Sequence, residues 1–213
     1  MEVIFAYMDN VSKRIGIPGG TFDPIHIGHL IIAQYALECL KLDKVVFIPS
    51  GKPPHKDSNS VTDAEHRYNM TAEAVFGNDQ FEVSDLEINR EGYTYTVDTL
   101  TQLRQLYGER AKLFFIIGAD NIKEIVNWKD AEKLFGMCEF VAFMRPGFDD
   151  SYYKQIEDLR KTYKAEIHVI KAPLIDISST MIRNRVAEGK SVKYMLPERV
   201  EKYIIKNGLY KGH

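Results

Sequence analysis

The stretch Gly19-Gly20-Thr21-Phe22-Asp23-Pro24-Ile25-His26-Ile27-Gly28-His29 decides how this chain folds. It follows a short apolar strand expected at 14–17 and leads into a helix with apolar periodicity expected at 27–41. Two glycines at a strand end let the backbone approach a ligand closely. The helix start offers free N–H groups and partial positive charge, and His26 and His29 point the same way there. The stretch therefore predicts a phosphate site that carries two imidazoles.

The composition is that of an ordinary globular protein, with 45% hydrophobic and 27% charged residues in 213. A net charge of −2 favours neither a nucleic-acid nor a membrane-surface partner, so local positive groups must bind any anionic substrate. Cys39 and Cys138 lie in apolar segments, which predicts two buried thiols and a cytoplasmic location. No apolar run is long enough to span a membrane. The oligomeric state stays open, a homo-oligomer included.

Hydrophobic periodicity predicts strands that alternate with helices along the chain. Strands are expected at 14–17, 44–49, 81–88, 113–117, 139–144 and 167–171. Helices are expected at 27–41, 62–76, 96–107, 130–135, 151–163, 179–188 and 198–206. Thr62 and Glu65 fit a capping box, and Gly108 fits a helix stop. This alternation predicts the α/β class: a doubly wound parallel sheet of Rossmann-like type, with C-terminal helices. We expect one domain over 14–207, preceded by an N-terminal extension over 1–13.

The polar motifs of the chain all follow predicted strands. They occupy residues 19–29, 51–56, 118–120, 145–147 and 178–183. The carboxyl ends of parallel strands meet at one edge of an open sheet, and ligands bind there at the topological switch point. We therefore expect these motifs to form one site, with the polar segment 51–60 as an active-site loop.

The first motif has other possible interpretations, which the rest of the sequence helps to decide. A tight turn with a helix cap would make His26 and His29 surface residues. A zinc site would need a third and a fourth ligand, and neither cysteine is placed to supply one. The Gly-Lys-Ser/Thr ending of a P-loop is absent, and so is the Gly-x-Gly-x-x-Gly fingerprint of a dehydrogenase. The phosphate site thus belongs to neither of these classes, and no protein metal ligands are predicted.

The first motif resembles the signature of the nucleotidylyltransferases built on a dinucleotide-binding-like fold. That superfamily combines a His-x-x-His helix start with a late Ser/Thr-x-x-Arg motif, which stands here as Ser178-Ser179-Thr180-Met181-Ile182-Arg183. Taken alone, the late motif is a helix cap with a surface arginine. The resemblance implies that its hydroxyls and N–H groups hold the β- and γ-phosphates of ATP while Arg183 neutralises them.

Further segments resemble the bacterial nicotinate-nucleotide adenylyltransferases, over roughly residues 14–207. The resemblance implies transfer of AMP from ATP to nicotinate mononucleotide in NAD biosynthesis, giving nicotinate adenine dinucleotide and pyrophosphate. Two alternatives stay open: a sister nucleotidyltransferase acting on nicotinamide mononucleotide or phosphopantetheine, and a non-catalytic nucleotide sensor. The segments are Pro53-Pro54-His55-Lys56, Tyr95-Thr96-Val97-Asp98-Thr99-Leu100, Gly118-Ala119-Asp120 and the lone Trp128.

The resemblance assigns the acceptor to Thr96 and Trp128. The pyridine ring of nicotinate mononucleotide is flat and cationic, and tryptophan is the best side chain to stack on such a ring. A buried core tryptophan is the alternative, which the polar neighbours Asn127, Lys129 and Asp130 disfavour. A helix start at Thr96 would present N–H groups to the pyridine carboxylate; a plain N-cap is the alternative.

The proposed reaction needs no general base, because the attacking phosphate is already an anion. His26 and His29 are expected to stabilise charge on the α- and β-phosphates. Mg²⁺ is expected to bridge ATP oxygens and to use few protein ligands. Arg67 and Arg90 are expected on solvated faces, and His55 has no assigned role. The residues expected to bind ATP or its phosphates are Gly19, Gly20, Thr21, Phe22, Lys56, Gly118, Asp120, Arg145, Ser178, Ser179, Thr180 and Arg183.

Overall fold

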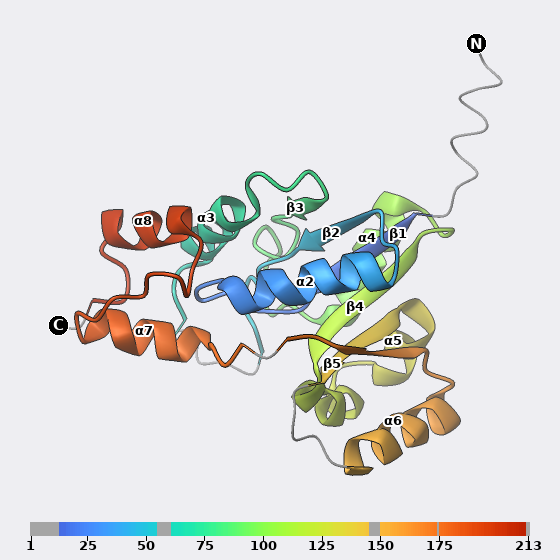
Figure 1. Ribbon diagram of the computed structural model, residues 1–213. Helices are drawn as coiled ribbons and strands as arrows, with labels where there is room; N and C mark the ends of the chain where they lie inside the picture. Colours follow the sequence, from blue (N-terminus) through green and yellow to red (C-terminus); the bar gives the residue numbers. More distant parts are fainter. Residues whose placement is uncertain (1–12, 55–60, 145–149, 174, 212–213) are drawn as a thin grey trace.

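The computed structural model describes residues 13–54, 61–144, 150–173 and 175–211. In this part of the chain six parallel strands form one sheet in the order β3-β2-β1-β4-β5-β6 (Figure 1). The order reverses between β1 and β4, which places a topological switch point there. The doubly wound α/β prediction is confirmed. The strands are β1 Arg14–Pro18, β2 Lys44–Phe47, β3 Phe81–Val83, β4 Lys112–Gly118, β5 Glu139–Met144 and β6 Ile167–Lys171.

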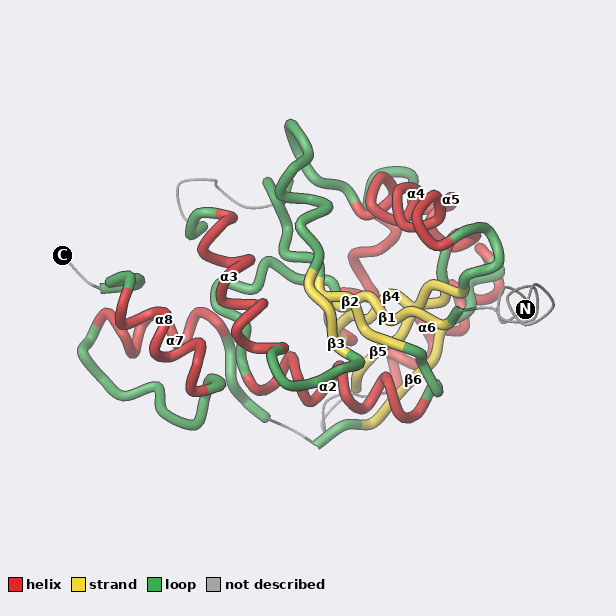
Figure 2. The backbone as a smooth tube through the Cα atoms, turned by 90° about the horizontal axis from the view of Figure 1, so that it is seen from above, coloured by secondary structure: helices red, strands yellow, loops and turns green. Residues whose placement is uncertain are grey.

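Helices cover both faces of the sheet. Viewed from above, α4 and α5 lie on one side of the strands and α2 lies on the other (Figure 2). A 3-10 helix, η2 (Ala119–Asn127), follows β4 directly. The α-helices are α2 Ile27–Cys39, α3 Ala64–Val75, α4 Thr96–Tyr107, α5 Ala131–Met137, α6 Asp150–Tyr163, α7 Ser179–Ala187 and α8 Glu198–Lys206.

The central strand β4 shows how the two layers arise from the sequence. Its side chains alternate between faces, as in any strand. Leu113, Phe115 and Ile117 join the core under α4, α5 and α6, whereas Phe114 and Ile116 join the core under α2, α3, α7 and α8. Both faces of this strand are buried, which explains why it is apolar without a break.

Three predicted details of the elements were wrong. The strand expected at 81–88 ends at Val83, because its pairing with β2 stops there. The capping box is not formed: Asp63 caps α3 by accepting the N–H of Glu65 at 2.8 Å. Cys39 is exposed near the end of α2, and only Cys138 is buried as expected. The helix η2 lay in a segment for which the sequence predicted no element.

The last helix, α8, packs beside α3, as Figure 1 shows at the upper left. Asn69 of α3 donates a hydrogen bond to the hydroxyl of Tyr203 in α8 at 3.2 Å. Tyr210, which follows α8, donates from its hydroxyl to the carboxylate of Asp23 at 2.7 Å. The C-terminal part of the chain is therefore tied to the first sequence motif.

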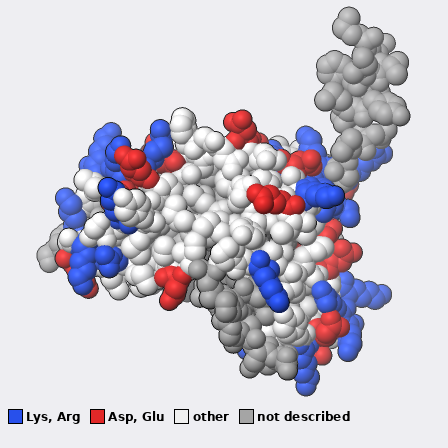
Figure 3. Space-filling model, viewed as in Figure 1, with Lys and Arg blue, Asp and Glu red and all other residues white. Residues whose placement is uncertain are grey.

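Acidic and basic side chains are interspersed on the face drawn in Figure 3. Among the described residues, no helix is both long enough and apolar enough to cross a bilayer.

Candidate active site

A cavity of about 890 Å³ opens at the carboxyl ends of the strands, beside the switch point. Its floor comes from β1 and β4, and its walls come from the segments after β2, from the start of α4 and from η2. This is where an open parallel sheet is expected to bind ligands. The lining residues important here are Gly19, Gly20, Thr21, Ser50, Glu87, Tyr95, Thr96, Thr99, Glu124, Trp128 and Lys129.

The glycine turn forms one end of this cavity. The N–H of Gly19 donates to the carbonyl of Ile116 at 3.0 Å, so the turn extends the β1–β4 pairing. A Cβ atom at Gly19 would lie 2.9 Å from the ring of Phe115, so a larger residue would not fit without movement. Phe22 was predicted to bind phosphate, but its ring is buried in the core. Only its backbone is left to approach a ligand.

The two histidines of the motif lie together at the start of α2. His26 is the N-cap residue, and its ring stacks on that of His29 with centroids 3.7 Å apart. The backbone N–H of His26 donates to Nδ1 of His29 at 3.2 Å. Because that Nδ1 atom accepts a hydrogen bond, the proton of the neutral His29 ring is on Nε2.

The electrostatic environment keeps His29 neutral. Burial and the neighbouring ring of His26 hold the pKa of His29 well below the ordinary value of 6.5. The Phe22 ring meets the His29 ring nearly at right angles, with centroids 5.2 Å apart. A neutral imidazole with its proton on Nε2 is a hydrogen-bond donor at physiological pH, and it does not act as an acid through an imidazolium ion.

The late motif lies at the start of α7 and contacts the first motif. Ser178 caps α7 by accepting the N–H of Met181 at 3.1 Å. The hydroxyl of Ser179 donates to the carbonyl of Pro24 at 2.8 Å. Arg183 donates to the carbonyl of Asp23 at 2.7 Å and to the hydroxyl of Thr180 at 3.3 Å. The fold therefore joins two motifs that lie about 155 residues apart in the chain.

The predicted acceptor residues lie at the other end of the cavity. Thr96 is the first residue of α4, and the N-cap is Tyr95, whose side chain makes no capping hydrogen bond. Trp128 is partly buried, follows η2 and lies nearly perpendicular to the Phe115 ring, with centroids 5.9 Å apart. Both residues line the cavity. Trp128 therefore packs against the core and also lines the cavity.

Arg67 was expected on a solvated face, and the structure corrects this prediction. It is 1% exposed, and its guanidinium donates to three backbone carbonyls. These are Thr62 at 2.8 Å, Thr21 at 2.8 Å and Gly51 at 3.1 Å. Arg67 therefore connects the glycine turn to the segment that follows β2. A basic residue within an amphipathic helix gives no sequence signal of such a role.

Arg90 was also expected in solvent, yet it belongs to a partly buried network behind the start of α4. It donates to the hydroxyl of Thr99 at 3.1 Å and to the side chain of Gln102. The Thr99 hydroxyl in turn donates to the carboxylate of Glu87 at 2.6 Å. Burial raises the pKa of Glu87, while hydrogen bonds from Thr99, Thr94 and the Gly51 N–H, and the charge of Arg90, oppose that rise.

Comparisons with known proteins show the family to which this chain belongs. The model of the cytidylyltransferase-like family matches residues 17–185. A probable nicotinate-nucleotide adenylyltransferase from Thermoanaerobacter sp. is 52% identical over 199 residues, which are 93% of this chain and 94% of that protein. One from Moorella thermoacetica is 51% identical, covering 93% of this chain and 92% of the relative. The chain belongs to the nicotinate-nucleotide adenylyltransferase family.

A solved structure supports the fold of this family member. The Plasmodium falciparum nicotinic acid mononucleotide adenylyltransferase, complexed with NaAD, superposes with a TM-score of 0.76. The two sequences are 24% identical, and the superposition covers 93% of this chain and 97% of the Plasmodium falciparum chain. Such a likeness shows a shared architecture, and it confirms the Rossmann-like nucleotidylyltransferase fold with C-terminal helices.

Some residues predicted for this adenylyltransferase-family site fall outside what the structure describes. Lys56 and Arg145 lie in segments that are not described, and the side chain of Asp120 is not described either. His55, for which no role was predicted, also lies outside the described residues. Gly118 ends β4 at the same edge of the sheet as the glycine turn.

Among the described residues, one cluster has metal-ligating groups close together: Glu139, Glu166 and His168. Glu139 begins β5 and His168 lies near the start of β6, so this cluster is at the amino ends of the strands. The cavity at the switch point lies at the opposite ends of the strands. The cluster is thus not part of the adenylyltransferase-family site.

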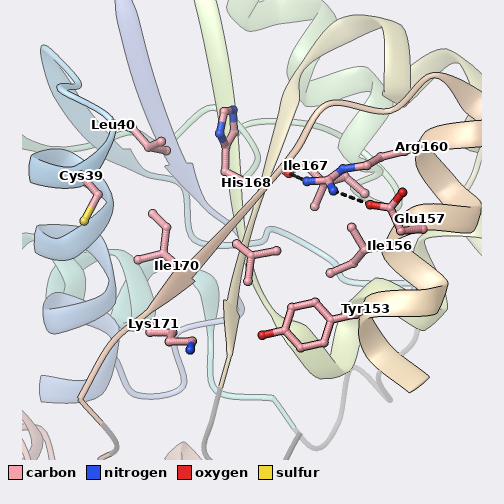
Figure 4. A pocket seen from close by; sticks show the side chains of 11 residues that line it. Cys39, Leu40, Tyr153, Ile156, Glu157, Arg160, Ile167, His168, Ile170 and Lys171 are labelled. Carbon is pink, nitrogen blue, oxygen red and sulfur yellow. Dashed lines mark hydrogen bonds and ion pairs between the residues drawn. The ribbon is translucent and has the colours of Figure 1, made fainter. Parts of the chain in front are cut away.

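A second hollow, of about 710 Å³, lies along the edge strand β6 between α2 and α6 (Figure 4). Leu40 and Cys39 line one side, and Tyr153 and Ile156 of α6 line the other. It contains none of the residues that the family resemblance assigns to substrate. The cavity at the switch point is therefore the candidate active site.

Proposed function

We propose that the protein transfers AMP from ATP to nicotinate mononucleotide, producing nicotinate adenine dinucleotide and pyrophosphate. The observation that carries this proposal is the single cavity that joins Gly19–Thr21 to Thr96 and Trp128. A glycine turn before a helix start suits phosphates. A helix start beside a partly buried tryptophan suits a cationic ring with an anionic substituent.

Adenylyl transfer requires the enzyme to bring two anions together in line. The acceptor phosphate attacks the α-phosphorus of ATP, the bond from that phosphorus to the bridging oxygen breaks, and pyrophosphate leaves. The His29 Nε2–H group would donate to an oxygen on the α- or β-phosphate, with His26 beside it. Since the ring is already neutral, this donor stabilises the growing charge without a proton transfer.

The start of α7 is suited to hold the leaving pyrophosphate. Ser178, Ser179 and Thr180 are at its first turn, where N–H groups and the helix dipole attract anions. Arg183 donates to the carbonyl of Asp23, which fixes its position beside the turn. A guanidinium carries five N–H donors, so that contact leaves capacity for phosphate oxygens. Lys56 and Arg145 are further candidates for phosphate contacts, and Asp120 for a ribose hydroxyl.

The Mg²⁺ ion is proposed to arrive with ATP as part of the substrate. The described lining of the cavity carries two acidic side chains, Glu87 and Glu124. Glu87 is engaged by Thr99, so the lining suits an ion held by phosphate oxygens and water rather than by a protein cage. When bound, the ion would neutralise charge on the triphosphate.

We also propose a cytoplasmic location and a single domain over residues 14–207. Two free cysteines among the described residues support a reducing compartment.

A pyrophosphate-release assay tests the proposed function. ATP with Mg²⁺ is combined in turn with nicotinate mononucleotide, nicotinamide mononucleotide and phosphopantetheine. The proposal expects the highest kcat/KM with nicotinate mononucleotide. A preference for another acceptor would assign the chain to a sister activity. Binding of ATP without turnover of any acceptor would indicate a nucleotide sensor.

A further inference from the structure

The charges that line the cavity are unevenly distributed. Among the described lining residues one side chain is cationic, Lys129, and two are anionic, Glu87 and Glu124. An acceptor with a carboxylate therefore meets an otherwise negative wall. Lys129 is the side chain in this lining with the opposite charge.

Lys129 lies at the acceptor end of the cavity. It directly follows Trp128, and its ammonium is 3.3 Å from the carboxylate of Asp98 in the first turn of α4. The same ammonium lies 4.5 Å from the centroid of the Tyr95 ring. Tyr95 occupies the N-cap position of α4, so the cation lies close to the helix start at Thr96. Lys129 and the α4 N–H groups therefore approach the same region.

The acid and the amide of the mononucleotide differ in formal charge. Backbone N–H groups donate to a carboxylate oxygen and to an amide oxygen alike, so at a helix start only the partial positive charge of the helix dipole favours the acid. A side-chain cation distinguishes them, because it attracts the carboxylate by its full charge and the neutral amide only by its dipole. Its pairing with Asp98 fixes the ammonium in place and reduces, without removing, that attraction.

We infer that Lys129 is a specificity-determining residue that favours nicotinate mononucleotide over nicotinamide mononucleotide. This inference rests on the proposed function. It assigns charge discrimination to the side chain that follows the ring-stacking Trp128, in addition to the helix start at Thr96.

The test compares kcat/KM for the two acceptors in the full chain and in three variants. Lys129→Met keeps the length of the side chain but removes its charge, and Lys129→Arg keeps the charge. The ratio of acid to amide should fall about three- to tenfold in Lys129→Met, because Lys129 is partly exposed and paired. The change should appear in the KM of the acid. Lys129→Arg should keep most of the acid-to-amide ratio of kcat/KM. Added salt should lower the same ratio in the unmodified chain.

Lys133→Met is the matched control, since Lys133 is exposed on α5 and does not line the cavity. An unchanged ratio in Lys129→Met, an equal loss with both acceptors, or the same fall in Lys133→Met would overturn the inference. If the unmodified chain turns over neither mononucleotide, the proposed function fails, which is a different result from an unchanged ratio.

Discussion

Arg67 donates from Nη2 to the carbonyl of Gly51 at 3.1 Å, and this bond connects α3 to the wall of the active-site cavity. Gly51 also packs so closely on Glu87 that a Cβ atom would lie 2.2 Å from the Glu87 carbonyl oxygen. Nη1 of the same guanidinium reaches Thr21 in the glycine turn. One buried cation therefore sets the distance between the two segments.

Replacing Arg67 by alanine should both destabilise the protein and loosen the site. Three backbone carbonyls would lose a charged donor, so the free energy of unfolding should fall by about 3 kcal/mol. Denaturant unfolding measures this change, and the KM values for both substrates should rise in the folded fraction. Arg199→Ala is the control, because Arg199 pairs with Glu73 at the surface and should cost less than about 1 kcal/mol. Equal losses in the two variants would contradict the role of Arg67.

Removing the His29 imidazole should reduce turnover without unfolding the protein. His29→Ala takes away a preorganised donor, and the loss of one such donor lowers kcat by about 10²–10³-fold. Steady-state kinetics and circular dichroism measure the two effects separately. His168→Ala, at the amino end of β6, should leave kcat near that of the unmodified chain. Near-normal turnover in His29→Ala would rule out its catalytic role.

The lowered pKa of His29 predicts how stability depends on pH. In the unfolded chain the ring takes up a proton near pH 6.5, whereas in the folded protein it stays neutral well below that value. The unfolded state therefore binds more protons in this window. The free energy of unfolding should fall as the pH drops from 7 toward 5, by up to about 1.4 kcal/mol per pH unit from this group.

His29→Asn isolates this contribution, because asparagine does not titrate. Its oxygen can also accept the N–H of His26, which keeps the capping interaction. The stability difference between the two chains should be constant above pH 7 and should narrow as the pH falls. Parallel curves across the whole range would mean that His29 titrates normally in the folded protein.

Trp128→Ala should weaken the acceptor more than ATP. Stacking of a cationic ring on tryptophan contributes roughly 1–2 kcal/mol when desolvated, so the acceptor KM should rise about five- to thirtyfold. Trp128→Phe should keep part of the effect, since it retains an aromatic face. Thermal unfolding is needed beside the kinetics, because Trp128 also contacts Phe115. An unchanged acceptor KM would remove the stacking role.

Much of the fold follows from local patterns in the sequence. The bounds expected at 96–107, 167–171 and 198–206 are those observed, because periodicity, Gly108 and Asn207-Gly208 mark them clearly. The strand expected at 81–88 was too long, since alternation continues past the point where pairing with β2 stops. The helix η2 was missed although Ile122 and Ile125, three residues apart, form its buried face.

Local sequence likewise predicts some residues of the candidate site and misses others. The glycine turn, the histidine pair and the late Ser/Arg motif are short and carry unusual residue types, so the sequence alone located them. The proximity of His26 to His29 follows from helix spacing, and the rings are in fact stacked. Arg67, Glu87 and Lys129 carry no motif. Their importance comes from neighbours distant in the chain, such as Thr21 for Arg67.

The sequence by itself determined the order of strands and helices along the chain and the edge of the sheet where the candidate site lies, and it predicted a phosphate-binding end for that site. These properties depend on contacts within a few residues. Only the tertiary structure decided that a buried arginine spans the cavity wall, that Ser179 meets Pro24, and that Lys129 lies close to the start of α4. Such contacts depend on how layers of the fold pack, and burial of a charge is stable only where distant carbonyls converge on it.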